Sequence, residues 1–401
     1  MKPEEKILRQ MFDAMVAAAQ PATCLPPHLP DLRKGRALVL GAGKAGASMA
    51  QAVEMAWPDE NLTGLVIVPT GYGLPTNKIE IVEASHPIPD QAGADAAQRI
   101  LNMADAFAAG AGPDDLALVL LSGGGSALMA VPIDGISLSD KQAVTKALLE
   151  SGASIQDINC VRKHLSAVKG GRLAERLGPV RKLTLAISDV VGDGPSVIAS
   201  GPMTADPTTV SDARAILDRY AIAGKDHLVE TSKTVSGDYR LIVTPTEALK
   251  AAAAVGRGAG FEIVDLGAEV MGEAREVARD HARRIAELPS GTILLSGGEL
   301  TVTHGHEISD LPKGGGPNRE YLMALKAVLD RPVFALAADT DGIDGSDAVA
   351  GAIMTPDQTG PDPEPYLAAH ASSAFWKAMG SEIVTGPTYT NVNDFRAILI
   401  P

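Results

Sequence analysis

Short apolar runs alternate with amphipathic segments along most of the chain. In the first part, the apolar runs predict strands at 36–40, 64–69, 116–121 and 182–187. The segments between them carry apolar residues at helical spacing and predict helices at 44–56, 91–109, 139–151, 154–167 and 170–177. Such alternation builds βαβ units, so we expect a mostly parallel sheet with ligands at the carboxyl ends of its strands.

A second set of the same kind follows a polar stretch that ends near residue 238. Its predicted strands are 239–243, 261–265, 291–295, 300–303, 332–337, 382–385 and 395–400, with helices at 246–258, 270–287 and 317–328. A chain of 401 residues also exceeds what one hydrophobic core usually organises. We therefore predict an α/β protein of two Rossmann-like domains, residues 1–237 and 238–401, each with a mostly parallel sheet flanked by helices.

The N-terminal segment, residues 1–19, predicts an amphipathic docking helix that is closed by Pro21. It lacks the continuous apolar stretch of a signal peptide, and no run elsewhere reaches the roughly 20 residues of a membrane span. The two cysteines, Cys24 and Cys160, fit a reducing compartment. We expect a soluble, cytoplasmic protein without a membrane partner.

The charge balance narrows the range of partners. The formal net charge is −14, and the chain has no basic stripe that could release counterions from a nucleic-acid backbone. Nucleic acid is therefore not an expected partner, and local basic groups must hold any anionic substrate.

Four glycine-rich turns directly follow apolar runs, at 41–46, 122–126, 296–299 and 339–342. Glycine lets backbone amides approach a phosphate closely, and a helix N-terminus behind the turn adds partial positive charge. This pattern predicts an enzyme that handles phosphorylated ligands.

The first turn, Gly41-Ala42-Gly43-Lys44-Ala45-Gly46, has the spacing of a dinucleotide fingerprint. A site for NAD normally needs an acidic residue at the end of the next strand, where this chain has Pro69-Thr70-Gly71. The turn is not a Walker A loop, since Ala follows Lys44. A lysine at a helix N-terminus is unfavourable unless an anion joins it, so Lys44 is either an anion-binding residue or a solvated surface lysine.

The second turn is the stronger candidate for an anion loop. Its residues, Ser122, Gly123, Gly124, Gly125 and Ser126, offer a nest of amide donors supported by two hydroxyls. A plain tight turn has the same composition. After the strand at 182–187, Asp189 and Asp193 have a spacing that a loop can bring to one Mg²⁺, although each could instead cap a turn or a helix.

A basic segment at 162–172 stands out in this acidic chain. Within it, Lys169 lies beside two glycines, which again suggests backbone approach to an anion, whereas most charge runs are solvated faces. We interpret His86 and His164 as structural, since no His/Cys spacing resembles a zinc site. The acidic loop at 339–347 lacks two ligands that an EF-hand requires.

Taken in order, these motifs resemble those of the glycerate 2-kinase family, two-domain proteins whose smaller domain is called MOFRL. Some members carry the older label hydroxypyruvate reductase. The matching segments cover almost the whole chain and lie at 41–46, 85–90, 121–128, 163–174, 188–193, 199–202, 295–299, 339–345 and 385–394. The resemblance implies a MOFRL core at about 290–399 and an active site in the cleft between the domains.

The resemblance also implies ATP-dependent phosphorylation of D-glycerate at its 2-hydroxyl, giving 2-phospho-D-glycerate. Under this hypothesis the 122–126 loop holds the ATP phosphates, Asp189 and Asp193 carry Mg²⁺, and Lys44 stabilises the transferred group. Asp189 could instead act as the base for the glycerate hydroxyl. A homodimer is compatible with this hypothesis.

Arg319 or Lys169 would bind the substrate carboxylate, and Lys169 could also contact the cofactor. The family's usual arginine position is Pro317 in this chain. Arg319 lies two residues later, either facing the cleft at the start of a helix or serving as an ordinary helix residue.

Two other functions remain open. An NAD(P)H-dependent hydroxypyruvate reductase fits the glycine spacing of the first turn and the older family label. A non-catalytic nucleotide or metabolite sensor would bind ATP without turnover. Assays for ATP-dependent product from glycerate and for NADH oxidation with hydroxypyruvate distinguish them.

Overall fold

The computed structural model describes the chain except residues 33–34, 191, 193, 304–310 and 346. It divides into two compact units, one of residues 21–242 and one of residues 1–20 together with 243–401. The sequence predicts a boundary between residues 237 and 238, whereas the change of unit falls between Ile242 and Val243, and the N-terminal helix packs with the C-terminal unit. The assignment of residues 1–237 and 238–401 as the two functional domains stays a prediction.

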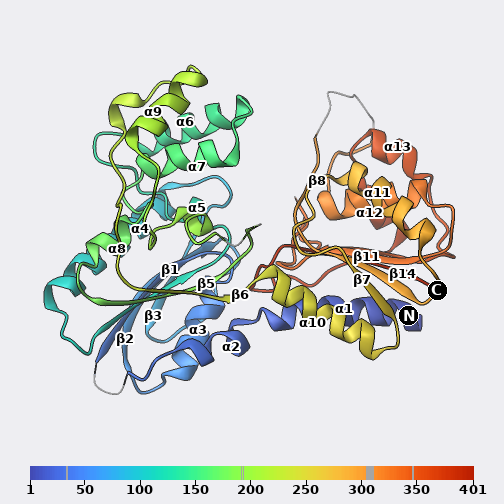
Figure 1. The fold of residues 1–401 in the computed structure, drawn as a ribbon, viewed down its shortest axis with the longest axis horizontal. Coiled ribbons are helices and arrows are strands. Elements are labelled where there is room, and N and C mark those ends of the chain that lie inside the picture. Colours follow the sequence, from blue (N-terminus) through green and yellow to red (C-terminus); the bar gives the residue numbers. More distant parts are fainter. Residues whose placement is uncertain (33–34, 191, 193, 304–310, 346) are drawn as a thin grey trace. The chain divides into compact units, whose positions relative to one another are not determined.

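The unit of residues 21–242 is built on a six-stranded sheet of order β3-β2-β1-β4-β5-β6 (Figure 1). The strands are β1 (Arg36–Ala42), β2 (Asn61–Pro69), β3 (Ile79–Ala84), β4 (Leu116–Leu121), β5 (Arg181–Ile187) and β6 (Asp238–Val243). The pairings from β3 through β5 are parallel, as predicted. Every residue of β4 is buried, because helices cover a parallel sheet on both faces and its central strands are continuously apolar.

Strand β6 corrects one expectation from the sequence. The run at 239–243 was predicted to open the second set of strands, but β6 lies at the edge of the first sheet, beside β5. Apolar periodicity identifies a strand without identifying its partner, because the partner depends on which sheet edge is within reach.

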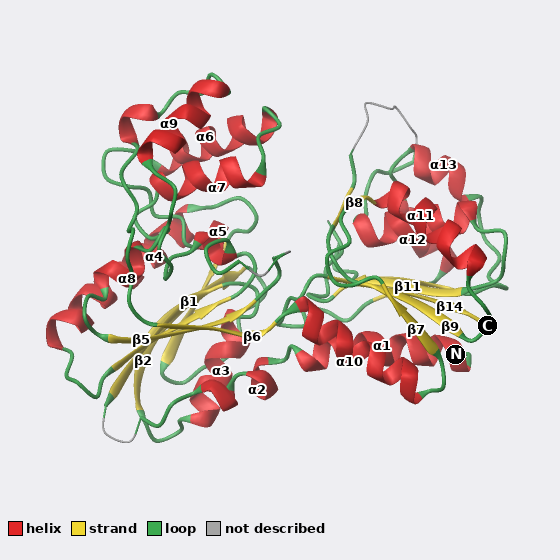
Figure 2. Ribbon diagram, in the orientation of Figure 1, coloured by secondary structure: helices red, strands yellow, loops and turns green. Residues whose placement is uncertain are grey.

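Helices cover both faces of this first sheet (Figure 2). They are α2 (Pro21–Cys24), α3 (Gly46–Ala56), α4 (Gln91–Gly110), α5 (Gly125–Leu128) and α8 (Arg172–Arg176). Three further helices, α6 (Leu138–Glu150), α7 (Ile155–His164) and α9 (Val210–Arg219), pack around a small core of their own that includes Leu148, Val161 and Leu217.

The second unit contains a six-stranded sheet of order β13-β12-β11-β14-β9-β7. Its strands are β7 (Glu262–Asp265), β9 (Thr292–Ser296), β11 (Phe334–Asp339), β12 (Gly351–Met354), β13 (Glu382–Ile383) and β14 (Asp394–Ile400). Only β7 and β9 pair in parallel, and the other pairings are antiparallel. The prediction of a mostly parallel sheet is therefore wrong for this unit. The described residues between β11 and β12 form no helical crossover, which agrees with the antiparallel pairing of the two strands.

Helices also flank the second sheet. α1 (Pro3–Ala18) packs against α10 (Pro245–Gly258), β11 and β14. α12 (Pro317–Val328) packs against β11 and β12, and it contacts α11 (Ala274–Glu287), α13 (Pro363–Ala368) and α14 (Ser372–Met379). A short pair, β8 (Gly272–Glu273) with β10 (Leu300–Thr301), completes the unit. None of the described helices combines the length and apolar character that a bilayer crossing requires.

Candidate functional site

The carboxyl ends of β1 and β4 bring two of the predicted glycine turns into contact. The backbone N–H of Lys44 donates to the carbonyl of Gly123 at 2.8 Å, and the N–H of Ala45 donates to Ser122 Oγ at 3.0 Å. Gly43 has φ +138°, and a Cβ there would lie 2.1 Å from Ser122 Oγ. The two turns therefore form one structure, which requires glycine where the chains cross.

The loop after β4 has the shape of an anion cradle. Gly124 is left-handed, with φ +82°. Among the described residues, the amides of Gly123 and Gly124 donate no backbone hydrogen bond. Successive amides of this kind form a concave nest for an anion. A Cβ at Gly124 would lie 3.0 Å from His86 Nε2, so the His86 ring forms a wall of the loop.

A strained turn supports the cradle from the other side. Ala199 and Ser200 both have positive φ, at 51° and 59°, a conformation that costs a residue with a side chain about 1–3 kcal/mol. The Ser200 hydroxyl is hydrogen-bonded to that of Ser126, and a Cβ at Gly125 would lie 2.9 Å from the Ala199 Cβ. Strain of this kind clusters at functional sites. Only the family resemblance drew attention to this segment.

The same turn anchors the basic segment. The amides of Gly170 and Gly171 donate to the carbonyls of Ser200 and Gly201, at 3.2 and 2.8 Å. Lys169 is almost fully buried, and its Nζ donates to the Met129 carbonyl at 2.6 Å. Burial lowers the pKa of Lys169 well below its usual value, and neighbouring cations lower it further.

Asp189 lies just beyond the carboxyl end of β5, partly buried. Since β5 pairs in parallel with β4, Asp189 and the 122–126 loop lie at the same edge of the sheet. Asp193, the second predicted magnesium ligand, lies outside the described residues. Within the described chain, no group of three or more His, Cys, Asp or Glu side chains could hold a metal ion. Asp189 supplies a single hard oxygen ligand, which fits Mg²⁺ only together with phosphate oxygens and water.

Arg319 lies in the other compact unit and is fully buried. Its Nε is 3.0 Å from an Asp344 carboxylate oxygen, and one terminal nitrogen is 2.9 Å from Asp347. Asp344 also accepts the amides of Asn318 and Arg319, so it caps the start of α12. Burial raises the pKa of Asp344 to about 6, although the Arg319 charge opposes this shift. The structure therefore gives Arg319 the position of a helix residue that anchors an acidic loop, and its catalytic role stays a prediction.

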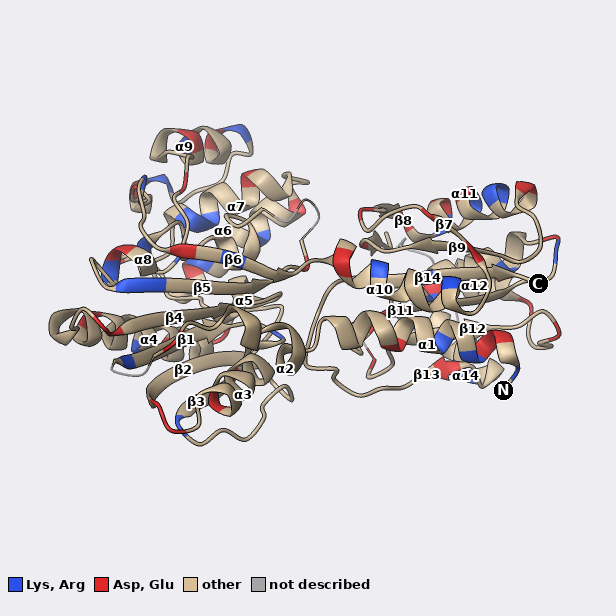
Figure 3. Ribbon diagram, turned by 60° about the horizontal axis from the view of Figure 1, so that its bottom comes forward, with Lys and Arg blue, Asp and Glu red and all other residues tan. Residues whose placement is uncertain are grey.

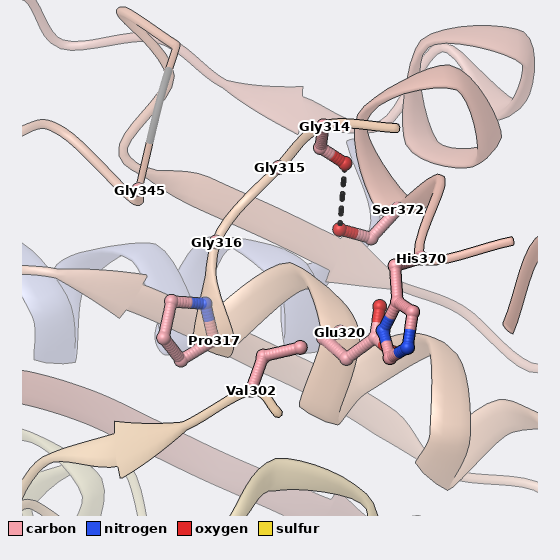
Figure 4. A pocket seen from close by; sticks show the side chains of 9 residues that line it. All are labelled: Val302, Gly314, Gly315, Gly316, Pro317, Glu320, Gly345, His370 and Ser372. Atoms are coloured by element: carbon pink, nitrogen blue, oxygen red, sulfur yellow. Dashed lines mark hydrogen bonds and ion pairs between the residues drawn. The ribbon is translucent and has the colours of Figure 1, made fainter. Parts of the chain in front are cut away.

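A pocket of about 350 Å³ lies beside the start of α12 (Figure 4). The residues that line it include Gly314, Gly315, Gly316, Pro317, Glu320, His370 and Ser372. Glu320 accepts a 2.8 Å hydrogen bond from Arg275 Nε, and its carboxylate lies 3.2 Å from His370 Nδ1. Among the described groups, the amides of Asn318 and Arg319 are bonded to Asp344, and Arg275 is paired with Glu320, so these donors are already occupied.

Comparison with known proteins identifies the family. Residues 7–232 match a family described as a domain of unknown function, DUF4147, and residues 292–394 match the MOFRL family. A protein of Thermotoga maritima named D-glycerate 2-kinase is 36% identical, over 99% of this chain and 98% of its own. This chain belongs to the glycerate kinase family. The crystal structure of a glycerate kinase from Thermotoga maritima has a TM-score of 0.87 and 34% identity, and 99% of each chain is covered.

Membership of the glycerate kinase family, predicted from the order of the motifs, is confirmed. The names within the family nevertheless differ. An Agrobacterium vitis protein, 47% identical over 98% of this chain and 94% of its own, is named "Putative hydroxypyruvate reductase". Family membership therefore identifies an α/β enzyme related to glycerate kinases, whereas the names of its relatives give two different activities.

The predicted site residues are divided between the two units. Lys44, the 122–126 loop, Lys169 and Asp189 belong to residues 21–242, and Arg319 belongs to the other unit. Within the first unit, a backbone hydrogen bond joins the Lys44 turn to the glycine loop, and side-chain hydrogen bonds of Ser126 and Lys169 connect that loop to the Lys169 segment. The sequence analysis did not assign Ser200 or His86 to this site, because neither has a local spacing that points to the glycine loop.

Proposed function

We propose that this glycerate kinase family member is an ATP-dependent kinase that converts D-glycerate to 2-phospho-D-glycerate. The observation that supports it most is the joined pair of turns at β1 and β4. There the Lys44 turn is bonded to a left-handed glycine loop, in which two successive described amides donate no backbone hydrogen bond. The relatives named as glycerate kinases support the same activity.

Phosphoryl transfer depends mainly on positioning and on positive charge around the moving group. In this proposal the amides and hydroxyls of the 122–126 loop bind the phosphates of ATP. Lys44, carried by the adjoining turn, stabilises the negative charge that develops on the transferred phosphoryl group.

Asp189 follows the carboxyl end of β5. We assign it to Mg²⁺, with Asp193 as the second predicted ligand, or to the proton of the glycerate 2-hydroxyl. A bound Mg²⁺ would neutralise charge on the phosphate oxygens. Arg319 or Lys169 stays the predicted partner of the substrate carboxylate. Lys169 is favoured over Arg319, because its bond to the Met129 carbonyl places it beside the glycine loop.

A hydroxypyruvate reductase is the second candidate, favoured by the fingerprint spacing at 41–46 and by the names of some relatives. The end of β2 argues against it. A dinucleotide site normally has a carboxylate there for the ribose hydroxyls, and β2 ends at Pro69, followed by Thr70 and Gly71.

One experiment separates the two activities. The protein is incubated with ATP, Mg²⁺ and D-glycerate, and the product is identified by phosphorus NMR. In parallel, NADH and NADPH oxidation is followed with hydroxypyruvate. We expect 2-phosphoglycerate and no cofactor oxidation. Oxidation of NADH or NADPH without a phosphorylated product would contradict the kinase proposal and support the reductase activity.

A further inference from the structure

Two basic side chains of the 21–242 unit are bonded to the end of the glycine loop, and a third lies within electrostatic reach of both. Lys141 comes from α6, Arg162 from α7, and Lys169 from the segment before α8 (Figure 3 marks the basic positions of the chain in blue). Lys141 and Lys169 are 6% and 1% exposed, and Arg162 is partly exposed. The charge of Arg162 acts on both lysines, so the three groups lie within electrostatic reach of one another.

Both lysines hold one short stretch of backbone. Lys169 Nζ donates to the carbonyl of Met129 at 2.6 Å, and Lys141 Nζ donates to those of Ala130 and Val131 at 3.2 and 3.3 Å. These carbonyls directly follow α5, the one-turn helix that begins in the glycine loop. The two amines are therefore attached to the end of the loop that we propose to bind phosphate.

The other basic residues of this region have acceptors that account for them. Lys163 forms an ion pair with Asp206 at 3.3 Å. Arg172 donates to the carbonyls of Lys163, Ser166, Val229 and Glu230. Their positions are explained by the fold alone.

Lys141, Arg162 and Lys169 lack a matching negative charge. Within the described part of the chain, no ion pair joins any of the three to a carboxylate, and Arg162 makes no hydrogen bond. Burying cations without a counter-charge is costly. Burial lowers the pKa of Lys141 to about 7, and the charges of Arg162 and Arg172 lower it further. Arg162 cannot avoid this cost by losing its proton, because a guanidinium stays charged at ordinary pH.

Support of the backbone explains only part of this arrangement. The carbonyls of residues 129–131 require donors, and two amines supply them. They do not require a third cation, and Arg162 contacts none of them. The excess positive charge instead fits a ligand that brings the missing negative charge.

We propose that Lys141, Arg162 and Lys169 form a binding site for a small oxyanion, which in the proposed reaction is the carboxylate of the hydroxy acid. The identity of that anion rests on the proposed function. Each protonated lysine keeps at least one N–H beyond its carbonyl bonds, and a guanidinium has five donors. A carboxylate can therefore be bound while the backbone contacts persist. The site selects hydroxy acids over uncharged polyols, because a neutral ligand would leave the cations unpaired.

The test compares Lys141→Met and Arg162→Gln with a matched control, Lys146→Met, in the full chain. Lys146 lies on the same helix as Lys141, but it is exposed, and its ion pair is with Glu150. We expect the KM for D-glycerate to rise about tenfold to a hundredfold in either site variant, the loss typical of a charged hydrogen bond. The KM for ATP should stay within about twofold, and the control should change neither constant.

The KM for D-glycerate, compared with stability, separates a ligand site from a structural role. Lys141→Met removes a buried cation but also a donor to the Ala130 and Val131 carbonyls, so a modest fall in its thermal midpoint is expected in either case. A lower midpoint with an unchanged KM for D-glycerate would mean that Lys141 only supports the backbone, and the inference would be wrong. If Lys141→Met does not fold, the KM of Arg162→Gln tests the site instead. The Arg162 side chain is partly exposed, and no hydrogen bond joins it to a described residue.

A second measurement does not depend on the kinase activity. Sulfate, added at constant ionic strength, should raise the thermal midpoint of the wild-type protein and of Lys146→Met but not of the two site variants. An equal shift in all proteins overturns the site even if D-glycerate is a substrate. If the protein does not phosphorylate D-glycerate, a selective sulfate shift still supports the anion site. An effect confined to the KM for ATP overturns the carboxylate assignment.

Discussion

The backbone and the side chain of Lys44 have separate tasks. Its amide holds the Gly123 carbonyl, and the next amide holds the Ser122 hydroxyl. The joined turns therefore depend on the main chain and on Ser122, and the proposal assigns catalysis to the Lys44 ammonium. This separation lets the chemistry be tested without disturbing the loop.

We predict that Lys44→Met lowers kcat by about 10²–10³-fold, the usual effect of losing a group that stabilises transition-state charge. The thermal midpoint should not change. Steady-state kinetics and thermal unfolding measure both quantities, and Lys250→Met, an exposed position on α10, serves as the control. Near-normal turnover would remove Lys44 from the mechanism.

Arg319 is expected to behave differently, because its guanidinium already has partners. Arg319→Met leaves the buried carboxylate of Asp344 without its charge partner, so the free energy of unfolding should fall by about 3–5 kcal/mol. Urea unfolding measures the change, with exposed Arg283→Met as the control. Unchanged stability together with a raised KM for D-glycerate would restore the substrate-binding role predicted from the sequence.

At the scale of elements, a buried histidine joins two helices of the second unit. His281 on α11 has its Nδ1 2.7 Å from the Tyr321 hydroxyl on α12. Burial lowers the pKa of His281 to about 4, and the nearby Arg396 charge lowers it further. Between about pH 4 and pH 6.5, the folded protein therefore holds this imidazole neutral, whereas the unfolded chain would protonate it.

This pKa shift predicts a pH dependence of stability. The contribution of neutral His281 is complete above pH 6.5 and is lost as the pH falls from about 6.5 to about 4, because the unfolded state then binds the extra proton. The loss is on the order of 3 kcal/mol. Urea unfolding across this range should show a shallower dependence for His281→Gln than for the wild type or for His28→Gln. Equal slopes would contradict the assignment.

The sequence predicts elements well where periodicity is long and local. The bounds of β4 and α12 agree with the predicted runs. In contrast, β3 carries Glu80 and Glu83 at a sheet edge, and β12 has only four residues, so neither has a clear apolar period. The antiparallel pairing of β11 with β14 joins segments that are far apart in the chain, and no local pattern encodes it.

The candidate site follows the same rule. The glycine loop and the Lys44 turn are visible from spacing alone, because each is a local motif. The contact of Ser126 with Ser200 and the attachment of Lys141 to the loop end exist only after folding. The pairing of Arg319 with Asp344 likewise connects residues from separate motifs, so the sequence left the role of Arg319 open.

For the whole molecule, the first helix belongs to the unit formed by the last part of the chain. α1 buries Leu8, Met11, Phe12 and Met15. The Phe12 ring packs edge-on against Phe395 of β14, with centroids 5.8 Å apart. The carbonyl of Ala19 accepts a 2.7 Å hydrogen bond from the Thr390 hydroxyl. The helix is thus part of the core of the second unit.

We predict that Phe12→Ala destabilises the second unit by about 3–5 kcal/mol, the usual cost of removing a buried aromatic ring. Hydrogen exchange should rise in β11 and β14, and the amides of β1 and β4 should be unaffected. Lys6→Ala, an exposed position on the same helix, is the control. Faster exchange in β1 instead would show that the helix stabilises the other unit.

The division of the chain also sets an order of events during synthesis. Residues 3–18 are synthesised before their docking surface, which consists of α10, β11 and β14 and is translated more than two hundred residues later. Through most of translation, the apolar face of α1 has no native partner. The nascent protein must therefore keep this apolar helix face from aggregating until β14 emerges, so α1 docks only near the end of synthesis.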